Sequence, residues 1–453
     1  MSVFRPLATP VVALAAVLVL AGCSGGSGGG AAAQAPRPAW HTTEVNAVSR
    51  AAVATGVAAV TSMKPDGTLE TAALDLSSGR ALWRRPASLA GRLPGMGVPP
   101  PAAVSAAGGK GVVAAAAPSG KSGKEALLVA ADARTGHELW SRPVRTTFGP
   151  QACGPYLCVS EHTALATARM VVLDPLTGAE LWRLPGIAEA EWSDTGKVVV
   201  LRLAKHPALS THDLRTGKTV WELPVEQALA PGVDLSGGWS FGSAGGDLIG
   251  YVAPYTSPRT GRASVFGVFS VRLADGKVNW LRPSVVRVYP SGSPGFAPVV
   301  RPVDEKGRFG GFARLDPGSG RVVGQITADQ VPGTGWWLAF PGDMARLGFL
   351  KPSHAGASFE LASGRPVPVT GQRGWSFCVT DPKPLALTRT PQGFFPVASL
   401  CEFDLATGVR APTGAVPPQW FTGSQDGWRL WRDEKGGLHA VRDATGTTPG
   451  MYG

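Results

Sequence analysis

Cysteines are the residues of this sequence whose type and spacing most directly suggest chemistry. Four of the five lie in the body of the chain, at positions 153, 158, 378 and 401. Cys153 and Cys158 enclose the turn-like segment Gly154–Leu157, whereas Cys378 and Cys401 lie in two strand-like segments joined by a long loop. A zinc site is a poor alternative, because no histidine has the spacing of the usual ligand sets. We therefore predict two structural disulfides, Cys153 with Cys158 and Cys378 with Cys401, in an oxidising compartment.

The fifth cysteine, Cys23, follows a segment typical of an export signal. Arg5 precedes the apolar run Val11–Leu20, which is shorter than the roughly 20 apolar residues that a membrane-spanning helix needs. The residues Leu20-Ala21-Gly22-Cys23 resemble the lipobox of bacterial lipoproteins, in which the cysteine thiol receives a diacylglycerol and the chain is cleaved just before it. This resemblance implies a signal peptide over residues 1–22 and a lipid on Cys23. Residues 23–36, rich in Gly, Ser and Ala, would form a flexible tether at the extracytoplasmic face of the cell membrane.

Histidines and tryptophans offer two further kinds of candidate site. The seven histidines are scattered, and His137 and His212 lie beside turn-like segments, where we expect solvated surface side chains. Trp336-Trp337 could form a ligand platform, as could the group Trp420, Trp428 and Trp431. Packing in the core is the more common use of such residues, because large aromatic side chains dominate core energetics. The sequence therefore predicts no catalytic residue and no metal site.

An internal repeat defines the elements that would position any site. Its clear copies have Asp four residues before Gly and Trp four residues after it: Asp75, Gly79 and Trp83; Asp132, Gly136 and Trp140; Asp174, Gly178 and Trp182; Asp213, Gly217 and Trp221. Weaker copies centre on Gly276 with Trp280, Gly320 with Asp316, Gly364, Gly408 with Asp404, and Gly446. Successive glycines lie 38 to 59 residues apart. Repeats of this length with strand-like composition indicate the blades of a β-propeller.

The residue types in each copy indicate a β-hairpin with a packing residue. Apolar residues before the Asp and after the Gly are typical of two strands. The Asp carboxylate and the Ser or Thr hydroxyl can bond to the turn backbone, and Gly tolerates the positive φ that tight turns demand. The Trp supplies a large flat surface that suits packing between neighbouring sheets. With 60 Gly and 40 Pro in 453 residues, the composition also argues against a helical bundle.

The pattern D-x-x-T-G-x-x-x-W, with Ser78 replacing the Thr in the first copy, resembles the repeat of quinoprotein-type (PQQ-binding-like) β-propellers, nearest in style to lipoproteins of the BamB type. The resemblance implies an all-β, closed propeller of four-stranded blades over residues 37–453. We expect eight blades, within a range of seven to nine. Trp40 has no turn before it and the Gly446 copy has no Trp strand after it. The N-terminal strand is therefore expected to complete the last blade.

Quinoprotein dehydrogenases also resemble this repeat, so an enzyme must be considered. Enzymes of that family carry a disulfide between adjacent cysteines over the quinone, and calcium ligands that include Asn. This chain has no adjacent cysteines, and its two asparagines are Asn46 and Asn279. We therefore expect no cofactor and no enzymatic activity. A surface enzyme, quinoprotein-like or a hydrolase, and a ligand sensor with a pocket on the propeller face stay open as alternatives.

The charge balance bears on the class of partner. Lys and Arg exceed Asp and Glu by 43 to 32, and removal of the signal peptide with Arg5 leaves a net charge of +10. The basic residues are dispersed, whereas nucleic-acid binding would require them clustered on a recognisable module. The sequence thus favours a lipid-anchored, monomeric, non-enzymatic binding or assembly scaffold whose partner is a protein or a cell-wall component. The high content of Ala, Gly, Pro and Arg is typical of high-GC bacteria.

Overall fold

The structure is a computed structural model that divides into two compact units, residues 1–35 and 36–453. It describes residues 39–89, 98–120, 126–146, 148–161, 168–289, 299–330, 336–338, 346–351, 353–360, 363–380, 397–412, 416–417, 423–425 and 427–442, all in the second unit. The predicted signal peptide and the tether with Cys23 lie outside the described residues. Among the helices that are described, none has the length and apolar character needed to cross a membrane.

Antiparallel sheets make up almost all of the described structure, and we number them as blades in chain order. Blades 1 to 3 are β2 (Ala52–Ala54), β3 (Val57–Met63), β4 (Leu69–Asp75) and β5 (Ala81–Pro86); β6 (Ala102–Ser105), β7 (Gly111–Pro118), β8 (Ala126–Asp132) and β9 (Glu138–Val144); and β10 (Pro150–Cys153), β11 (Tyr156–Glu161), β12 (Arg169–Leu173) and β13 (Glu180–Pro185). Blades 4 to 6 are β14 (Ile187–Ser193), β15 (Lys197–Leu203), β16 (Ala208–Asp213) and β17 (Thr219–Pro224); β18 (Trp239–Ala244), β19 (Asp247–Val252), β20 (Gly267–Arg272) and β21 (Val278–Pro283); and β22 (Val285–Tyr289), β23 (Val299–Pro302), β24 (Phe312–Leu315) and β25 (Val322–Ile326).

The remaining blades are less complete in the described part of the chain. Blade 7 contains β26 (Trp336–Leu338), β27 (Arg346–Lys351) and β28 (His354–Glu360), and blade 8 contains β29 (Arg373–Thr380) and β30 (Val397–Asp404). Blade 9 joins β31 (Gly423–Gln425), β32 (Trp428–Arg432) and β33 (Leu438–Arg442) to the N-terminal strand β1 (Trp40–Thr42). The helical segments are short: η1 (Ala107–Gly109), α1 (Val225–Ala228), η3 (Leu235–Gly237) and η4 (Ala328–Gln330).

Contacts between the blades follow the order of the chain. The first strands β2, β6, β10, β14 and β18 contact one another in succession, and β20 contacts β22. Phe312 of blade 6 packs against Phe349 of blade 7, with ring centroids 4.8 Å apart. The series continues from β26 to β29, from β30 to β32, and from β31 back to β2. This cyclic order is that of the predicted β-propeller. The described residues form nine sheets, one more than the eight blades that the sequence favoured and within the predicted range of seven to nine.

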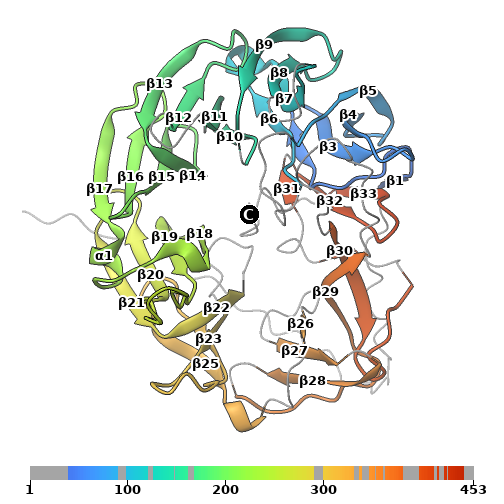
Figure 1. The fold of residues 1–453 in the computed structure, drawn as a ribbon. Helices are drawn as coiled ribbons and strands as arrows, with labels where there is room; N and C mark the ends of the chain where they lie inside the picture. Colours follow the sequence, from blue (N-terminus) through green and yellow to red (C-terminus); the bar gives the residue numbers. More distant parts are fainter. Residues whose placement is uncertain are drawn as a thin grey trace, which may run out of the picture. The chain divides into compact units, whose positions relative to one another are not determined.

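The N-terminal strand β1 completes blade 9. Its three residues pair antiparallel with β33, so that Trp40 lies opposite Ala440. Figure 1 shows β1, in blue, beside the red strands of the C-terminal blade. Trp40, Val53 and Leu438 belong to one buried cluster, which joins blade 9 to blade 1. Strand β1, which has no repeat turn before it, therefore supplies the fourth strand of blade 9, as predicted.

The turns of the repeat are held by hydrogen bonds from their own Asp. In blade 2, the Asp132 Oδ1 atom accepts bonds from the backbone N–H of Thr135 at 2.8 Å and from its hydroxyl at 2.9 Å. Gly136 closes the turn at φ +69°, where a side chain would be strained. Asp75, Asp174, Asp213, Asp316 and Asp404 make corresponding bonds in the other turns.

The repeated tryptophans of blade 9 and of blades 1 to 5 link each of these blades to the next one, and we call each link a tryptophan latch. In the latch of blade 4, the Trp221 indole packs on Gly276 of blade 5 and donates its Nε1–H to the Leu273 carbonyl at 2.9 Å. Trp40, Trp83, Trp140, Trp182 and Trp280 pack in the same way on Gly79, Gly136, Gly178, Gly217 and Gly320. They donate to the carbonyls of Leu76, Ala133, Pro175, Leu214 and Pro317, respectively. Six inter-blade contacts are thus built from one motif.

A β-bulge before the latch tryptophan sets its direction in blades 1 to 5. In blade 2, Ala130 pairs with Trp140 and Ala131 with Glu138, so that Leu139 is the extra residue. The same shift precedes Trp83, Trp182, Trp221 and Trp280. A bulge bends its strand and re-aims the following side chain. In blades 2 to 5 it leaves the preceding residue at the solvent surface, whereas Leu82 of blade 1 is partly buried. In all five blades the tryptophan faces the next blade.

Candidate functional site

The four body cysteines form two buried disulfides. Cys153 is bonded to Cys158 across the β10–β11 hairpin, with Cα atoms 5.8 Å apart. Cys378 of β29 is bonded to Cys401 of β30, with Cα atoms 5.9 Å apart. All four residues are at most 2% exposed. Both bonds therefore lie within single blades, where they brace strand pairs and offer no accessible thiol.

The repeat aspartates are engaged in structure. The Thr216 hydroxyl and backbone N–H lower the pKa of Asp213, and the backbone N–H of Thr135 does the same for Asp132, although burial opposes the effect. In blade 1, the Ser77 side chain lowers the pKa of Asp75. These carboxylates stay ionised at neutral pH, and the Oδ1 atom of each accepts hydrogen bonds within its own turn. None is placed to act as an acid or base.

His212 is buried, contrary to the expectation of a solvated side chain, whereas His137 is exposed as expected. His212 directly precedes the turn residue Asp213 at the end of β16. Leu74 and Leu173 occupy the same position in blades 1 and 3, and both are buried. The Nε2 atom of His212 lies 2.8 Å from the Ser210 hydroxyl oxygen and its Nδ1 lies 3.1 Å from the Gly217 carbonyl oxygen. Burial lowers the pKa of His212, so the neutral ring serves as a hydrogen-bonded core residue.

The predicted aromatic platforms are only partly described. Trp336 and Trp337 lie on β26, although their side chains lie outside the description, as does Trp420 entirely. Trp431 is 4% exposed and stacks on His439, with centroids 5.0 Å apart. Trp428 is partly buried against the cluster between blades 9 and 1. The two described side chains thus serve packing, which leaves them little surface for a ligand.

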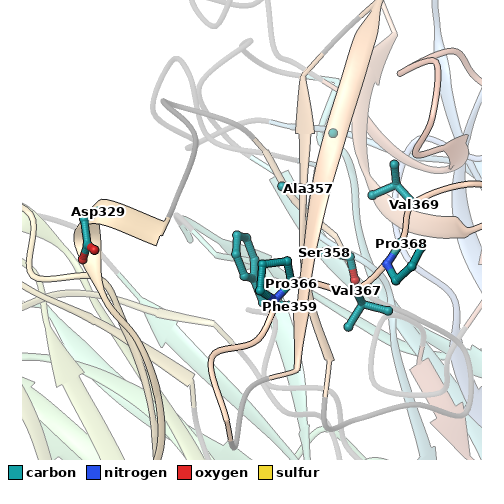
Figure 2. Close-up of a pocket in the computed structure, with 9 residues that line it drawn as sticks. Asp329, Ala357, Ser358, Phe359, Pro366, Val367, Pro368 and Val369 are labelled. Carbon is teal, nitrogen blue, oxygen red and sulfur yellow. The ribbon is translucent and has the colours of Figure 1, made fainter.

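An open pocket of about 540 Å³ lies beside β28. It is lined by Gly356–Phe359, by the segment Pro366–Val369 and by Asp329 of η4. Figure 2 shows Phe359 beside Pro366, with Asp329 on a separate element across the opening. The nine lining residues include no histidine, cysteine or lysine. The pocket could hold an apolar group, and the reactive groups of its described lining are the Ser358 hydroxyl and the Asp329 carboxylate.

Two glutamates with unusual surroundings lie on β14, the first strand of blade 4. Glu189 is 4% exposed and accepts a hydrogen bond from the Ser160 hydroxyl at 2.9 Å. Glu191, the extra residue of a β-bulge, accepts a 2.6 Å hydrogen bond from Trp239 Nε1 of blade 5. Glu191 as a whole residue is partly exposed, whereas its carboxyl group is buried. Burial, with a contribution from Glu189, raises the pKa of Glu191 to about 8, so this carboxyl group is mostly protonated at neutral pH.

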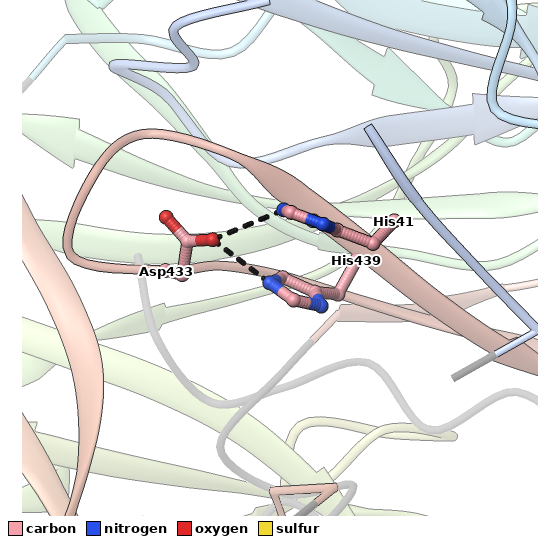
Figure 3. Close-up of side chains that lie close together, drawn as sticks. All are labelled: His41, Asp433 and His439. Atoms are coloured by element: carbon pink, nitrogen blue, oxygen red, sulfur yellow. Dashed lines mark hydrogen bonds and ion pairs between the residues drawn. The ribbon is translucent and has the colours of Figure 1, made fainter. Parts of the chain in front are cut away.

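A second cluster of titratable groups lies where β1 meets β33. His41 and His439 both approach the carboxylate of Asp433, which belongs to the turn before β33 (Figure 3). Burial alone would raise the pKa of Asp433, but hydrogen bonds from His439, Gly437 and Lys435 hold it below its usual value. Within the described residues, this is the group of His, Cys, Asp and Glu side chains whose spacing could hold a metal ion.

Sequence reasoning singled out none of the three residues, although a signal was present. In blades 1 to 5, the latch tryptophan pairs with the residue six positions before the turn glycine, as Trp83 does with Ala73. Applied to the last copy, this rule places Trp40 opposite Ala440 and therefore His41 opposite His439, as observed. Glu191 carried no comparable signal, because its burial depends on a bulge and on Trp239 of the next blade.

The fold and its repeated latches define the class of protein, a β-propeller built from turn-and-tryptophan repeats. The family described as "Outer membrane protein assembly factor BamB" matches residues 15–153 and 124–284, more than half of the chain. The chain therefore belongs to this family of PQQ-repeat propellers.

Several solved structures resemble the chain at low identity. BamB from Moraxella catarrhalis shares 12% identity, with 88% of this chain and 96% of that chain covered and a TM-score of 0.43. The quinohemoprotein alcohol dehydrogenase ADHIIG from Pseudomonas putida HK5 also shares 12%, with coverage of 85% and 78% and a TM-score of 0.37. The dihydro-heme d1 dehydrogenase NirN shares 13%, with coverage of 73% and 74% and a TM-score of 0.41. No curated protein matches the sequence.

Proposed function

We propose that the protein is a lipid-anchored, extracytoplasmic propeller that binds another protein and acts as a non-enzymatic assembly scaffold. Membership of a family described as an assembly factor supports this function. The lipobox-like sequence ending in Cys23 supports the anchor. The repeat residues themselves hold turns and latch blades, so they form a rigid support for a binding surface.

The observation that carries the proposal is a set of exposed aliphatic side chains at matching positions. Leu139, Leu181 and Val220 are the bulge residues of blades 2, 3 and 4, and they are 40%, 40% and 45% exposed. The bulge turns each following tryptophan inward and leaves these residues facing solvent. Contiguous exposed apolar patches mark protein interaction sites in soluble proteins, and these three side chains would act as such a site for a partner that spans neighbouring blades. The outer strands of three consecutive blades therefore form the proposed partner surface.

Site-specific photo-crosslinking in intact cells tests this surface. A photoreactive residue at position 139, 181 or 220 should capture one defined protein partner. Asn279 is the matched control, because it occupies the same bulge position in blade 5 and is polar. The double substitution Leu181→Glu and Val220→Glu should reduce capture at position 139 by about tenfold or more, since contact would then desolvate two charges.

Equal capture at position 279, or no loss in the double variant, would contradict the proposed surface. Calcium-dependent dye reduction by the purified protein, or a tightly bound quinone, would instead favour the enzyme alternative.

The anchor is tested by the variant Cys23→Ser. We expect the variant to be left unprocessed or to be released from the membrane fraction, because serine lacks the thiol that accepts the lipid. Mass spectrometry of the native N-terminus gives the direct measurement. An unmodified mature terminus downstream of Cys23 would disprove the anchor while leaving the partner surface untouched.

A further inference from the structure

Three side chains from opposite ends of the chain converge in blade 9. His41 of β1 and His439 of β33 are directly opposed in the strand register, and their rings stack with centroids 4.0 Å apart. The Asp433 Oδ2 atom lies 3.3 Å from His41 Nε2 and 2.8 Å from His439 Nε2. Figure 3 shows both imidazoles presenting a nitrogen to the same carboxylate oxygen. One donor atom from each residue lies within 4.8 Å of the other two.

We propose that His41, Asp433 and His439 bind a divalent transition-metal ion, for which Zn²⁺ is the best fit. Two imidazole nitrogens and a carboxylate oxygen are a donor set that Zn²⁺ accepts, and hard ions such as Ca²⁺ prefer oxygen alone. Zinc bonds of about 2.0–2.1 Å with tetrahedral angles place two ligand atoms about 3.3 Å apart. The His41–Asp433 distance of 3.3 Å has this value, whereas the His439–Asp433 distance is 2.8 Å. Binding therefore requires the His439–Asp433 contact to open and the two stacked rings to turn until both nitrogen lone pairs meet at the ion.

Neighbouring groups hold the ligands in place. The Asp433 Oδ1 atom accepts hydrogen bonds from the backbone N–H groups of Lys435 and Gly437, each at 2.9 Å, which leaves Oδ2 directed at the histidines. Trp431 lies nearly parallel to the His439 ring, at an interplanar angle of 10°. Outer contacts of this kind orient metal ligands and tune their affinity.

Space at the site depends on Gly437. A Cβ atom there would lie 2.7 Å from both Asp433 Oδ2 and His41 Nε2, inside the volume between the ligands. The His41 side chain is 42% exposed, against 12% for His439 and 13% for Asp433. The site is therefore open on the His41 side, where water can complete the coordination. The adjacent Arg432 directs its guanidinium elsewhere, to the Ala47 carbonyl and the Ser399 hydroxyl.

A bound ion would fasten the first strand of the propeller to the last blade. Strand β1 has only three residues, and its sheet partner is β33 alone. Binding replaces the His439–Asp433 hydrogen bond and the His41–Asp433 contact by three metal bonds, and both Nε2 atoms must be deprotonated. Since the unfolded chain lacks a preformed site, metal affinity adds to the stability of the closed blade.

Titration of the full-length protein in detergent with Zn²⁺ alone tests the site. We expect one tightly bound ion per chain and an increase in the unfolding midpoint at saturation. Loss of a residue that only supports a metal ligand typically lowers metal affinity 10- to 100-fold. His41→Ala removes a ligand itself, so it should weaken Zn²⁺ binding by at least this factor and abolish the increase in the unfolding midpoint. His206→Ala is the matched control, since this exposed histidine lies beside Glu226, outside the cluster, and should leave binding unchanged.

Asp433→Asn provides a second variant, because it preserves the size and the turn-bonding oxygen but removes the carboxylate charge. Each variant is first checked for an unfolding transition without metal, and Co²⁺ absorption reports coordination independently of stability. Loss of stoichiometric binding in His41→Ala or Asp433→Asn, with retention in His206→Ala, establishes the site. Absence of a stoichiometric ion in the native protein, or equal affinity in all variants, overturns the proposal and leaves a hydrogen-bonded triad.

Discussion

Replacing Trp221 with alanine should lower the free energy of unfolding by about 3–5 kcal/mol, the range for large buried aromatic side chains. Trp221 is 8% exposed and packs in a cluster with Leu223, Leu248 and Phe269, which belong to blades 4 and 5. Its indole also satisfies the Leu273 carbonyl. The substitution therefore removes a contact between blades, together with a partly buried hydrogen bond. Denaturant titration followed by tryptophan fluorescence and circular dichroism gives the measurement.

The neighbouring residue supplies a matched control for this prediction. Val220 is 45% exposed, and Val220→Ala should change stability by no more than about 0.5 kcal/mol. Gly276→Ala tests the other half of the latch, because a Cβ there would lie 2.7 Å from the Trp221 ring at a backbone φ of +74°. If Trp221→Ala proved as mild as Val220→Ala, the latches would not hold the blades together.

Stability should fall as the pH rises from about 4.5 to about 8, through the titration of Glu191. The folded-state pKa of about 8 lies above the ordinary value of 4.5. Between these values the folded protein retains a proton that the unfolded chain has released, so raising the pH favours unfolding. The contribution is complete below pH 4.5 and amounts to roughly 5 kcal/mol across the window. Unfolding free energies measured at intervals between pH 5 and pH 8.5 test the slope.

Glu191→Gln is the matched variant, because the amide mimics the neutral carboxyl and keeps an oxygen for the Trp239 N–H. We expect it to remove the slope and to leave the variant more stable than the native protein at pH 8. The buried His212, whose pKa is lowered from 6.5, adds an opposite slope in both proteins, so the comparison of the two profiles is the test. An identical slope in the variant would show that the Glu191 carboxyl is hydrated in solution.

Local chemistry made the propeller predictable. Asp132, Gly136 and Trp140 each fill a role that their side chains dictate, namely turn acceptor, positive-φ residue and packing anchor. The regular repetition of this short motif then predicted the fold. Because Trp40 has no turn before it, it also indicated that the N-terminal strand completes the last blade. The weaker copies at Gly364 and Gly408 do mark sheets of their own, so the structure has nine sheets where eight blades were favoured.

The candidate sites were harder to predict because each depends on tertiary register. His41 and Asp433 look unrelated in a linear reading, and they meet only after β1 has found β33. His212 lies on β16 at a position whose side chain faces the core, and the sequence reasoning missed this because the residue is next to a polar turn. Glu191 lies at a bulge, and bulges have no composition signal as strong as that of a turn. Residue types alone did not determine these surroundings.

The pairing of β1 with β33 sets an order of events in folding, because the two strands lie about 400 residues apart in the sequence. A chain that crosses the membrane N-terminus first exposes β1 long before β33 arrives, so the strand waits with an unpaired edge. Each earlier latch, by contrast, closes as soon as the turn of the following blade has been made. Truncation before β33 would therefore leave β1 without a partner. A circularly permuted chain that begins at β2 and carries β1 after β33 would remove the delay.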